Sequence, residues 1–202
     1  MATHSYDTLG EENCFEKGYR HLMEGNYAEA IEAYRKGLLT DPDDSAAYYN
    51  LGNAYYFQRD YRKAIEAYQQ AIQINPGHAD AYNNLGIAYK SQGNYFQAIR
   101  AYQKATQAKP AYAIAYNNLG IAYKRQGYYA QAVKAYQKAI RIRPNDAFVY
   151  NNLGNAYSSQ GNYAGAVKAL EKAIRINPNY EEAKRSLQLA REQMNKNKGK
   201  FK

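Results

Sequence analysis

The chain of 202 residues contains one cysteine, three histidines and no tryptophan. A single cysteine excludes an internal disulfide, and Cys14 stands where a packing residue is expected. The histidines, His4, His21 and His78, are far apart, and the chain shows neither a cluster with metal-ligand spacing nor a glycine-rich phosphate loop. We therefore expect no metal site, no cofactor and no enzymatic activity.

Long hydrophobic runs are also absent. No apolar stretch approaches the roughly 18 residues that a membrane-spanning helix needs. The first ten residues combine Asp7 with polar side chains and lack a basic start followed by an apolar segment. The sequence therefore predicts a cytoplasmic protein without membrane insertion.

Proline is scarce but periodic. The five prolines recur every 34 residues, and four of them follow a Leu-Gly pair whose glycine lies 24 residues earlier. This spacing predicts an array of five copies of one unit. The prolines are Pro42, Pro76, Pro110, Pro144 and Pro178, and the predicted repeats are residues 11–44, 45–78, 79–112, 113–146 and 147–180.

Each unit contains two stretches with apolar residues at helical spacing, as in Tyr48, Leu51 and Tyr55, so we expect two helices of about 14 residues per unit. A glycine in the left-handed conformation can end the first helix, and Asn or Asp can cap the second. Small residues facing large tyrosines would let the two helices approach closely. The predicted glycines are Gly25, Gly93, Gly127 and Gly161, and the predicted caps are Asn26, Asp60, Asn94 and Asn162.

This pattern resembles the tetratricopeptide repeat, whose motif has an aromatic residue, Leu, Gly, Tyr, Ala, a second aromatic, Ala and Pro at set positions. The resemblance extends over residues 11–180 and departs mainly at the two ends. Repeat 11–44 has Cys14, Lys17, His21 and Gly37 at motif positions, and Leu170 replaces a tyrosine in the last repeat. Repeat 79–112 matches the motif in full with Tyr82, Leu85, Gly86, Tyr89, Ala98, Tyr102, Ala105 and Pro110.

The resemblance implies an all-α fold, a right-handed α-solenoid of five tetratricopeptide helical hairpins. Residues 181–195 keep one apolar side, which predicts a C-terminal capping helix. We expect residues 1–10 to form an N-terminal extension and residues 196–202 to form a basic disordered tail.

Asparagine recurs on the predicted first helices, although it is a mediocre helix former. The resemblance implies that positions 2, 5, 6, 9, 12 and 13 of each repeat line a concave surface, where asparagine ladders hold the main chain of an extended peptide. We therefore predict a peptide-binding groove, and copying by recent duplication is the alternative explanation of the asparagines. The predicted groove residues are Asn50, Asn84, Asn118, Asn152, Asn83, Asn117, Asn151, Tyr49, Asn53, Ile87, Ile121, Lys90, Lys124 and Arg125.

The predicted groove changes character along the chain. It is aromatic toward the N-terminus, where Tyr56 and Phe57 stand, and it carries isoleucines and cations further on. This gradient predicts a protein or peptide partner with a hydrophobic stretch and an acidic flank. The lysine and asparagine clamp that binds chaperone carboxylates in other family members is not matched, because Phe15 and Tyr19 stand at its positions.

Charge is distributed unevenly. Repeat 11–44 holds nine acidic and four basic residues, whereas the whole chain has a net charge of +9. An acidic start and a basic end would also allow head-to-tail self-association into a structural homo-oligomer. Nucleic acid is the least favoured partner, because the basic residues are spread over the outer helices and no nucleic-acid module is present. A designed, consensus-like array without a natural ligand is a further alternative, against which the irregular first repeat argues.

Overall fold

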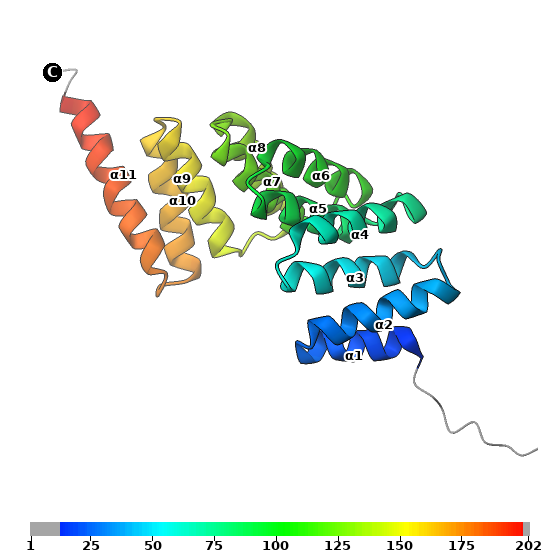
Figure 1. The fold of residues 1–202 in the computed structure, drawn as a ribbon. Coiled ribbons are helices and arrows are strands. Elements are labelled where there is room, and N and C mark those ends of the chain that lie inside the picture. Colours follow the sequence, from blue (N-terminus) through cyan, green and yellow to red (C-terminus); the bar gives the residue numbers. More distant parts are fainter. Residues whose placement is uncertain (1–12, 200–202) are drawn as a thin grey trace, which may run out of the picture. The chain divides into compact units, whose positions relative to one another are not determined.

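The computed structural model describes residues 13–199, which form eleven α-helices and no strand (Figure 1). The expected all-α fold is therefore confirmed, and the N-terminal extension expected at residues 1–10 lies outside the described residues. The helices alternate between a first and a second helix of each pair. They are α1 (Cys14–Glu24), α2 (Tyr27–Thr40), α3 (Ser45–Phe57), α4 (Tyr61–Ile74), α5 (Ala79–Ser91), α6 (Tyr95–Ala108), α7 (Ala113–Arg125), α8 (Tyr129–Ile142), α9 (Ala147–Ser159), α10 (Tyr163–Ile176) and α11 (Glu181–Gly199).

The chain divides into two compact units, Met1–Asn84 (unit 1) and Leu85–Lys202 (unit 2), and the division falls within α5. In unit 1, helices α1 to α4 each pack on the next helix in sequence. In unit 2, helices α6 to α11 do the same. Contacts between sequence neighbours are typical of a repeat array.

Within each pair, a glycine of the first helix lies against a large side chain of the second. Tyr68 and Tyr136 are 1% and 0% exposed. A Cβ atom added to Gly52 or Gly120 would lie 2.6 Å from the ring of the facing tyrosine. No larger residue fits there unless the ring moves. This arrangement agrees with the small and large residues that alternate in the sequence.

The irregular first repeat has its own form of this packing. The ring of Phe15 lies where a Cβ atom of Gly37 would be, and Gly37 is the residue that stands in place of the expected alanine. The aromatic ring has moved by one position, since Cys14 occupies the usual aromatic position. Cys14 and Gly37 both depart from the motif, and the two departures compensate each other. The ring that is missing at position 14 is supplied by Phe15, and Gly37 leaves the space that this ring needs.

Glycines end four of the first helices in the left-handed conformation, whereas Arg59 takes this place after α3 with a φ of 66°. A positive φ is uncommon for a residue with a side chain. Asp60, Asn94 and Asn162 then cap the following helices, and each Oδ1 accepts a backbone N–H at 2.9–3.2 Å. The left-handed glycines are Gly25, Gly93, Gly127 and Gly161.

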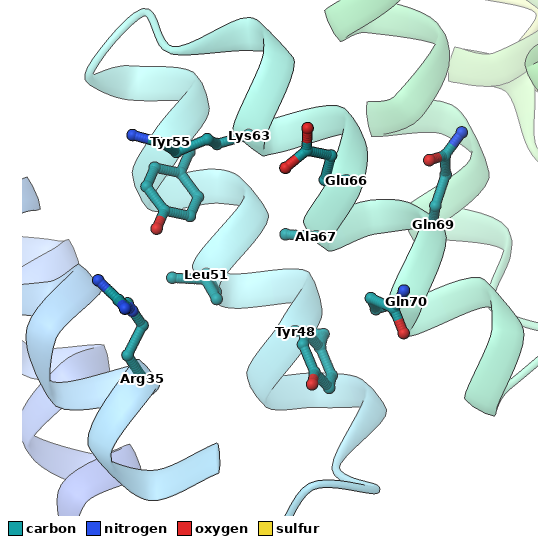
Figure 2. A pocket seen from close by; sticks show the side chains of 9 residues that line it. All are labelled: Arg35, Tyr48, Leu51, Tyr55, Lys63, Glu66, Ala67, Gln69 and Gln70. Carbon is teal, nitrogen blue, oxygen red and sulfur yellow. The ribbon is translucent and has the colours of Figure 1, made fainter. Parts of the chain in front are cut away.

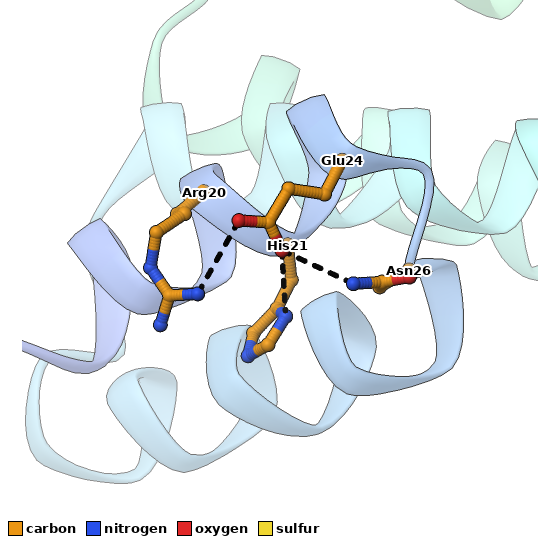
Figure 3. A network of polar contacts seen from close by, with 4 residues as sticks. All are labelled: Arg20, His21, Glu24 and Asn26. Carbon is orange, nitrogen blue, oxygen red and sulfur yellow. Dashed lines mark hydrogen bonds and ion pairs between the residues drawn. The ribbon is translucent and has the colours of Figure 1, made fainter.

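Asn26 occupies the N-cap position of α2, as predicted, but it does not cap the helix through its side chain. Its side chain makes no capping bond, and Nδ2 instead donates to Oε2 of Glu24 at 3.1 Å. The same carboxylate meets Arg20 Nη1 at 3.5 Å and His21 Nδ1 at 3.6 Å (Figure 3). The amide of Asn26 therefore serves this polar network at the end of α1.

Three first helices are capped by the last residue of the preceding repeat, a role that the sequence did not predict. Asp44 Oδ1 accepts two backbone N–H groups of α3 at 2.8 and 3.0 Å, and Asp146 Oδ1 accepts one of α9 at 3.2 Å. His78 Nδ1 accepts the N–H of Ala81 in α5 at 3.3 Å. Burial lowers the pKa of His78, which suits an imidazole that must be neutral at Nδ1 to accept a hydrogen bond.

Helix α11 covers the end of unit 2, where it packs on α9 and α10. Leu187 is 8% exposed and lies in a core cluster with Leu170 and Ala183. The helix continues to Gly199, so residues 196–199 are helical where a disordered tail was expected. Lys196 lies near its C-terminus, where the helix dipole favours a positive charge. Residues 200–202 lie outside the described residues.

Candidate functional site

In unit 1, the predicted groove residues of α3 and α5 form a hydrogen-bonded group around a buried tyrosine. The Tyr68 hydroxyl donates to Asn53 Oδ1 at 2.8 Å. Asn84 Nδ2 donates to the same oxygen at 2.9 Å and to the Tyr49 hydroxyl at 3.2 Å. Burial raises the pKa of Tyr68 far above its usual range, so this hydroxyl remains a donor at physiological pH. The predicted residues Tyr49, Asn53 and Asn84 are therefore brought together.

The other two predicted asparagines of unit 1 differ in accessibility. Asn83 is 3% exposed, and its Nδ2 donates to Asn84 Oδ1 at 3.2 Å. Asn83 is therefore a buried residue that orients the Asn84 side chain through a hydrogen bond. Asn50 is half-buried beside Tyr34. Burial raises the pKa of Tyr34 to about 12, and the neighbouring Asn50 amide acts in the opposite direction.

Aromatic side chains gather at the end of α3, as the sequence predicted for the N-terminal part of the groove. The rings of Phe57 and Tyr27 stack at 5.5 Å, and Tyr56 meets the Phe57 ring edge-on at 5.8 Å. Phe57 and Tyr19 remain 55% and 54% exposed. This part of unit 1 exposes apolar surface to solvent.

In unit 2, the asparagines of neighbouring first helices are joined directly. Asn152 Nδ2 on α9 donates to Asn117 Oδ1 on α7 at 3.0 Å. Asn118 and Asn152 are half-buried. Ile121 also lies half-buried on α7, against the core of unit 2. We use the term inner face of unit 2 for the surface of Ile87, Lys90, Asn117, Asn118, Ile121, Lys124, Arg125 and Asn152.

Three cations crowd one edge of this inner face. Burial lowers the pKa of Lys90 and of Lys124, and the positive charge of Arg125 lowers both further. None of the three forms an ion pair within 4.0 Å with a residue that the structure describes. Arg125 is exposed, whereas Lys90 and Lys124 are half-buried ammonium groups without a bonded counter-charge, which is unfavourable for the fold.

The Tyr136 hydroxyl in unit 2 lacks the hydrogen bond that the equivalent Tyr68 hydroxyl makes in unit 1. Ile121 occupies the position that Asn53 holds two repeats earlier, and Tyr136 corresponds to Tyr68. The Tyr136 hydroxyl is buried and makes no hydrogen bond to a described residue. Burial raises the pKa of Tyr136 well above its usual range, so the hydroxyl keeps its proton. The polar contact made by Asn53 in unit 1 is thus replaced by an apolar side chain here.

Asn151 is buried and is not accessible to a ligand in this structure, with 1% of its surface exposed. Its Nδ2 donates to the Tyr180 hydroxyl at 3.3 Å and to Oε1 of Glu182 on α11 at 3.1 Å. The sequence analysis did not predict the contact between Glu182 and Asn151, because residues from 181 onward were interpreted only as a capping helix. Continuing the 34-residue register beyond residue 180 would have placed Glu182 at position 2, a groove position.

A hollow of unit 1 lies elsewhere, between α2, α3 and α4, with a volume of about 590 Å³ (Figure 2). Leu51 and Tyr55 line it together with Lys63, whose ammonium lies 5.5 Å from the Tyr55 ring centre. Lys63 is already paired with Asp60 at 3.0 Å. The hollow lies along the line where these helices pack together, and none of the predicted groove residues lines it.

Residues 13–199 contain no group of His, Cys, Asp and Glu side chains that could hold a metal ion. Within the same residues, no helix is long and apolar enough to cross a membrane. The paired helices and the polar first-helix surface are those of a tetratricopeptide-repeat protein.

Residues 8–200 match the family model described as the Cilia and flagella-associated protein 70 C-terminal domain, a tetratricopeptide-repeat domain. The chain belongs to this family. A comparison with curated proteins found no match.

Solved structures of tetratricopeptide-repeat proteins share the fold. A crystal structure of MamA is 31% identical, covers 84% of this chain and 92% of its own, and has a TM-score of 0.76. MamA from Desulfovibrio magneticus RS-1, from residue 41 to its end, is 22% identical, covers 85% and 98%, and has a TM-score of 0.77. YrrB, described as a TPR protein with an unusual peptide-binding site, is 22% identical, covers 86% and 89%, and has a TM-score of 0.75. The predicted tetratricopeptide solenoid is therefore confirmed.

Proposed function

We propose that this protein is a non-enzymatic adaptor of the cytoplasm that binds an extended peptide segment with an acidic part. The observation that carries the proposal is the crowding of Lys90, Lys124 and Arg125, without an ion pair to a described residue, on the face that also presents Asn118 and Asn152. The amides would hold the peptide main chain, and the cations would select acidic side chains.

The asparagines have different capacities for this task. Both N–H groups of Asn84 already donate within unit 1 and its Oδ1 accepts from Asn83, so the second lone pair of Oδ1 is the group that can receive a peptide N–H. Asn152 uses one N–H for Asn117 and keeps a second one. Asn83 and Asn151 are buried and serve as supports for neighbouring side chains. The peptide-binding site for which YrrB is described supports the proposal, because YrrB has the same fold.

The direct test is selection of a displayed library of random 12-residue peptides, followed by affinity measurement for the enriched sequences. We expect enrichment of peptides with acidic residues. Replacing Asn84 and Asn118 together by Ala should weaken binding by roughly 1–3 kcal/mol, as expected for a few lost hydrogen bonds. Circular dichroism should show unchanged helix content.

The matched control replaces two exposed asparagines away from the groove, Asn145 and Asn195, by Ala. This variant should bind the selected peptide like the wild type. Unchanged affinity in the Asn84 and Asn118 variant would show that these asparagines do not hold the peptide. Failure to enrich any peptide would contradict the proposed peptide-binding function.

A second candidate function is self-assembly, which the charge distribution favours. Unit 1 contains 13 acidic and 7 basic residues, and unit 2 contains 5 acidic and 20 basic residues. Opposite charges on two copies would attract each other and be screened by salt. Size-exclusion chromatography with light scattering should then show oligomers that dissociate in high salt. A monomer at every salt concentration would exclude this candidate.

A further inference from the structure

Side chains 20 positions apart join the second helix of one repeat to the first helix of the next in unit 2. Gln103 Nε2 on α6 donates to the Tyr123 hydroxyl on α7 at 2.8 Å. In the same way, Gln137 Nε2 on α8 donates to the Tyr157 hydroxyl on α9 at 3.0 Å. The glutamines occupy position 25 of their repeats, and the tyrosines occupy position 11 of the repeats that follow.

Unit 1 lacks this bond between α2 and α3. The pairing persists even where the residue types change, since Arg191 Nη2 on α11 meets Glu171 Oε1 on α10 at 2.8 Å in the same register. Between α2 and α3 the corresponding residues are Arg35 and Tyr55. Neither side chain makes a hydrogen bond or an ion pair with a residue that the structure describes. Two groups that could donate hydrogen bonds therefore remain unused at this junction.

Arg35 and Tyr55 instead line the hollow of about 590 Å³, and Figure 2 shows them on the facing helices α2 and α3. Buried apolar side chains also line this hollow, since Leu51 and Ala67 are 6% and 5% exposed. The ring of Tyr48 adds an aromatic surface. The volume falls within the roughly 300–1,000 Å³ of small-molecule pockets.

The charges around the hollow leave one cation without a counter-charge. On α4, Lys63 pairs with Asp60 at 3.0 Å, and Glu66 pairs with Arg62 at 3.2 Å. The third charged residue of the lining is Arg35, which has no such partner. A guanidinium group presents its N–H donors in a planar arrangement that matches a carboxylate. The unbonded hydroxyl of the neighbouring tyrosine can donate to the same anion.

We propose that this hollow is a binding site for a small aromatic carboxylate. Arg35 and the Tyr55 hydroxyl hold the carboxylate, and the aromatic ring packs against Leu51 and the ring of Tyr48. The site contains none of the asparagines of the proposed peptide groove, so it extends the function of the protein beyond peptide binding. The same chemistry occurs at the C-terminus of a protein that ends in an aromatic residue, and the experiment separates the two sources.

The probe is naphthalene-2-carboxylate, and its uncharged amide is the reference. Nuclear magnetic resonance titrations at low salt should show saturable shifts of backbone amide signals in α2, α3 and α4. The amide should bind at least about fivefold more weakly, because it lacks the charge that Arg35 recognises. Acetate should also bind at least about fivefold more weakly, because it lacks the ring.

The register of the array supplies a variant that closes the hollow. Arg35→Gln introduces the residue that bonds tyrosine in unit 2, so it should form the missing bond to Tyr55. We expect probe binding to weaken at least about tenfold, with an unchanged or raised melting temperature. Lys36→Gln is the matched control, because it removes the same charge from an adjacent exposed residue of α2 and should change affinity less than about twofold.

Tyr55→Phe tests the second donor without altering the charge. It should weaken probe binding about three- to fivefold, because only the hydroxyl is lost. The variant that replaces both Asn84 and Asn118 should bind the probe like the wild type. The outcome for this site is therefore separate from the outcome for the proposed peptide groove.

Several outcomes would overturn the proposal. Equal losses for Arg35→Gln and Lys36→Gln would mean that only net charge attracts the probe. Unchanged binding by Arg35→Gln would exclude the guanidinium group as the recognition element. Absence of saturable shifts in the wild type would show that the hollow binds no aromatic carboxylate. Tighter binding of an acetylated tripeptide that ends in phenylalanine with a free carboxylate would assign the hollow to a protein C-terminus instead.

Discussion

At the scale of the residue, backbone conformation and side-chain volume decide which substitutions the repeats tolerate. Arg59 adopts a positive φ at the place where other repeats have glycine. Gly37 has no side chain where Phe15 fills the space. Both residues depart from the common pattern of the array, but the first carries conformational strain and the second removes a clash. The two cases predict opposite responses to substitution.

Arg59→Gly should stabilise the protein by up to about 1 kcal/mol, because glycine adopts a positive φ without steric cost. The reciprocal change, Gly93→Ala, should destabilise it by about 1 kcal/mol. A Cβ atom at Gly93 meets no atom within 4 Å, so only the backbone conformation is tested. Urea unfolding measures both free-energy changes. A lower unfolding free energy for Arg59→Gly would show that the positive φ of Arg59 does not strain the backbone.

Gly37→Ala should destabilise the protein by roughly 1–3 kcal/mol, because the new methyl group overlaps the Phe15 ring. In a Phe15→Ala background, the same change should stabilise by about 0.5–1 kcal/mol, since alanine is the better helix former. A double-mutant cycle from urea unfolding measures the coupling. Effects of Gly37→Ala that are equal in the two backgrounds would refute the compensation.

At the scale of the element, the helix ends depend on polar acceptors whose protonation can matter. His78 caps α5 through Nδ1, and its ring lies 4.9 Å from the Tyr49 ring. Burial lowers the pKa of His78 relative to an unfolded chain, where it is about 6.5. The stabilisation by this cap is therefore complete above about pH 6.5 and is lost as pH falls through the lower folded pKa.

His78→Asn should remove this pH dependence, because asparagine caps a helix without titrating. Relative to the variant, the wild type should lose roughly 0.5–1 kcal/mol of unfolding free energy between neutral and mildly acidic pH. Urea unfolding at several pH values provides the measurement. His21→Asn is the control and should retain the dependence that His78 causes. Identical pH profiles for wild type and His78→Asn would contradict the role of the cap.

At the scale of the whole molecule, most helix contacts within each unit join helices adjacent in sequence. Helix α11 packs only against the end of unit 2, on α9 and α10, among the contacts that the structure describes. A repeat array of this kind propagates a local loss of stability weakly. The effect of a core substitution should therefore remain near its own repeat.

Leu187→Ala should destabilise unit 2 by about 2–4 kcal/mol, because it leaves a cavity beside Leu170. Leu189→Ala is the control on the same helix, since Leu189 is 60% exposed, and should change stability by less than about 0.5 kcal/mol. Hydrogen exchange should accelerate in α9 to α11 and remain unchanged in α2 and α3. Equal acceleration in both units would show that the array unfolds as one body.

The period of the prolines and glycines was sufficient to predict the helical pairs. Helix formation and close packing of neighbours depend on residue types at fixed spacing, which a sequence displays directly. The packing of the first repeat was harder to predict, because Phe15 and Gly37 lie on two different helices and compensate each other only once these helices pack together. The sequence also did not predict the caps at Asp44 and His78. Both residues lie in the turn between two repeats, whereas the recurring glycine and Asn or Asp mark the turn within each repeat.

The sequence by itself determined the repeat, the helix order and the residue types that recur along the first helices, because all of these follow from periodicity. Only the tertiary structure decided which amides are accessible. Asn84 and Asn151 have the same chemistry, yet Asn151 is buried against Glu182 while Asn84 is half-buried among side chains of α3. Accessibility and hydrogen-bond partners depend on contacts between residues about 30 positions apart, which local patterns do not contain.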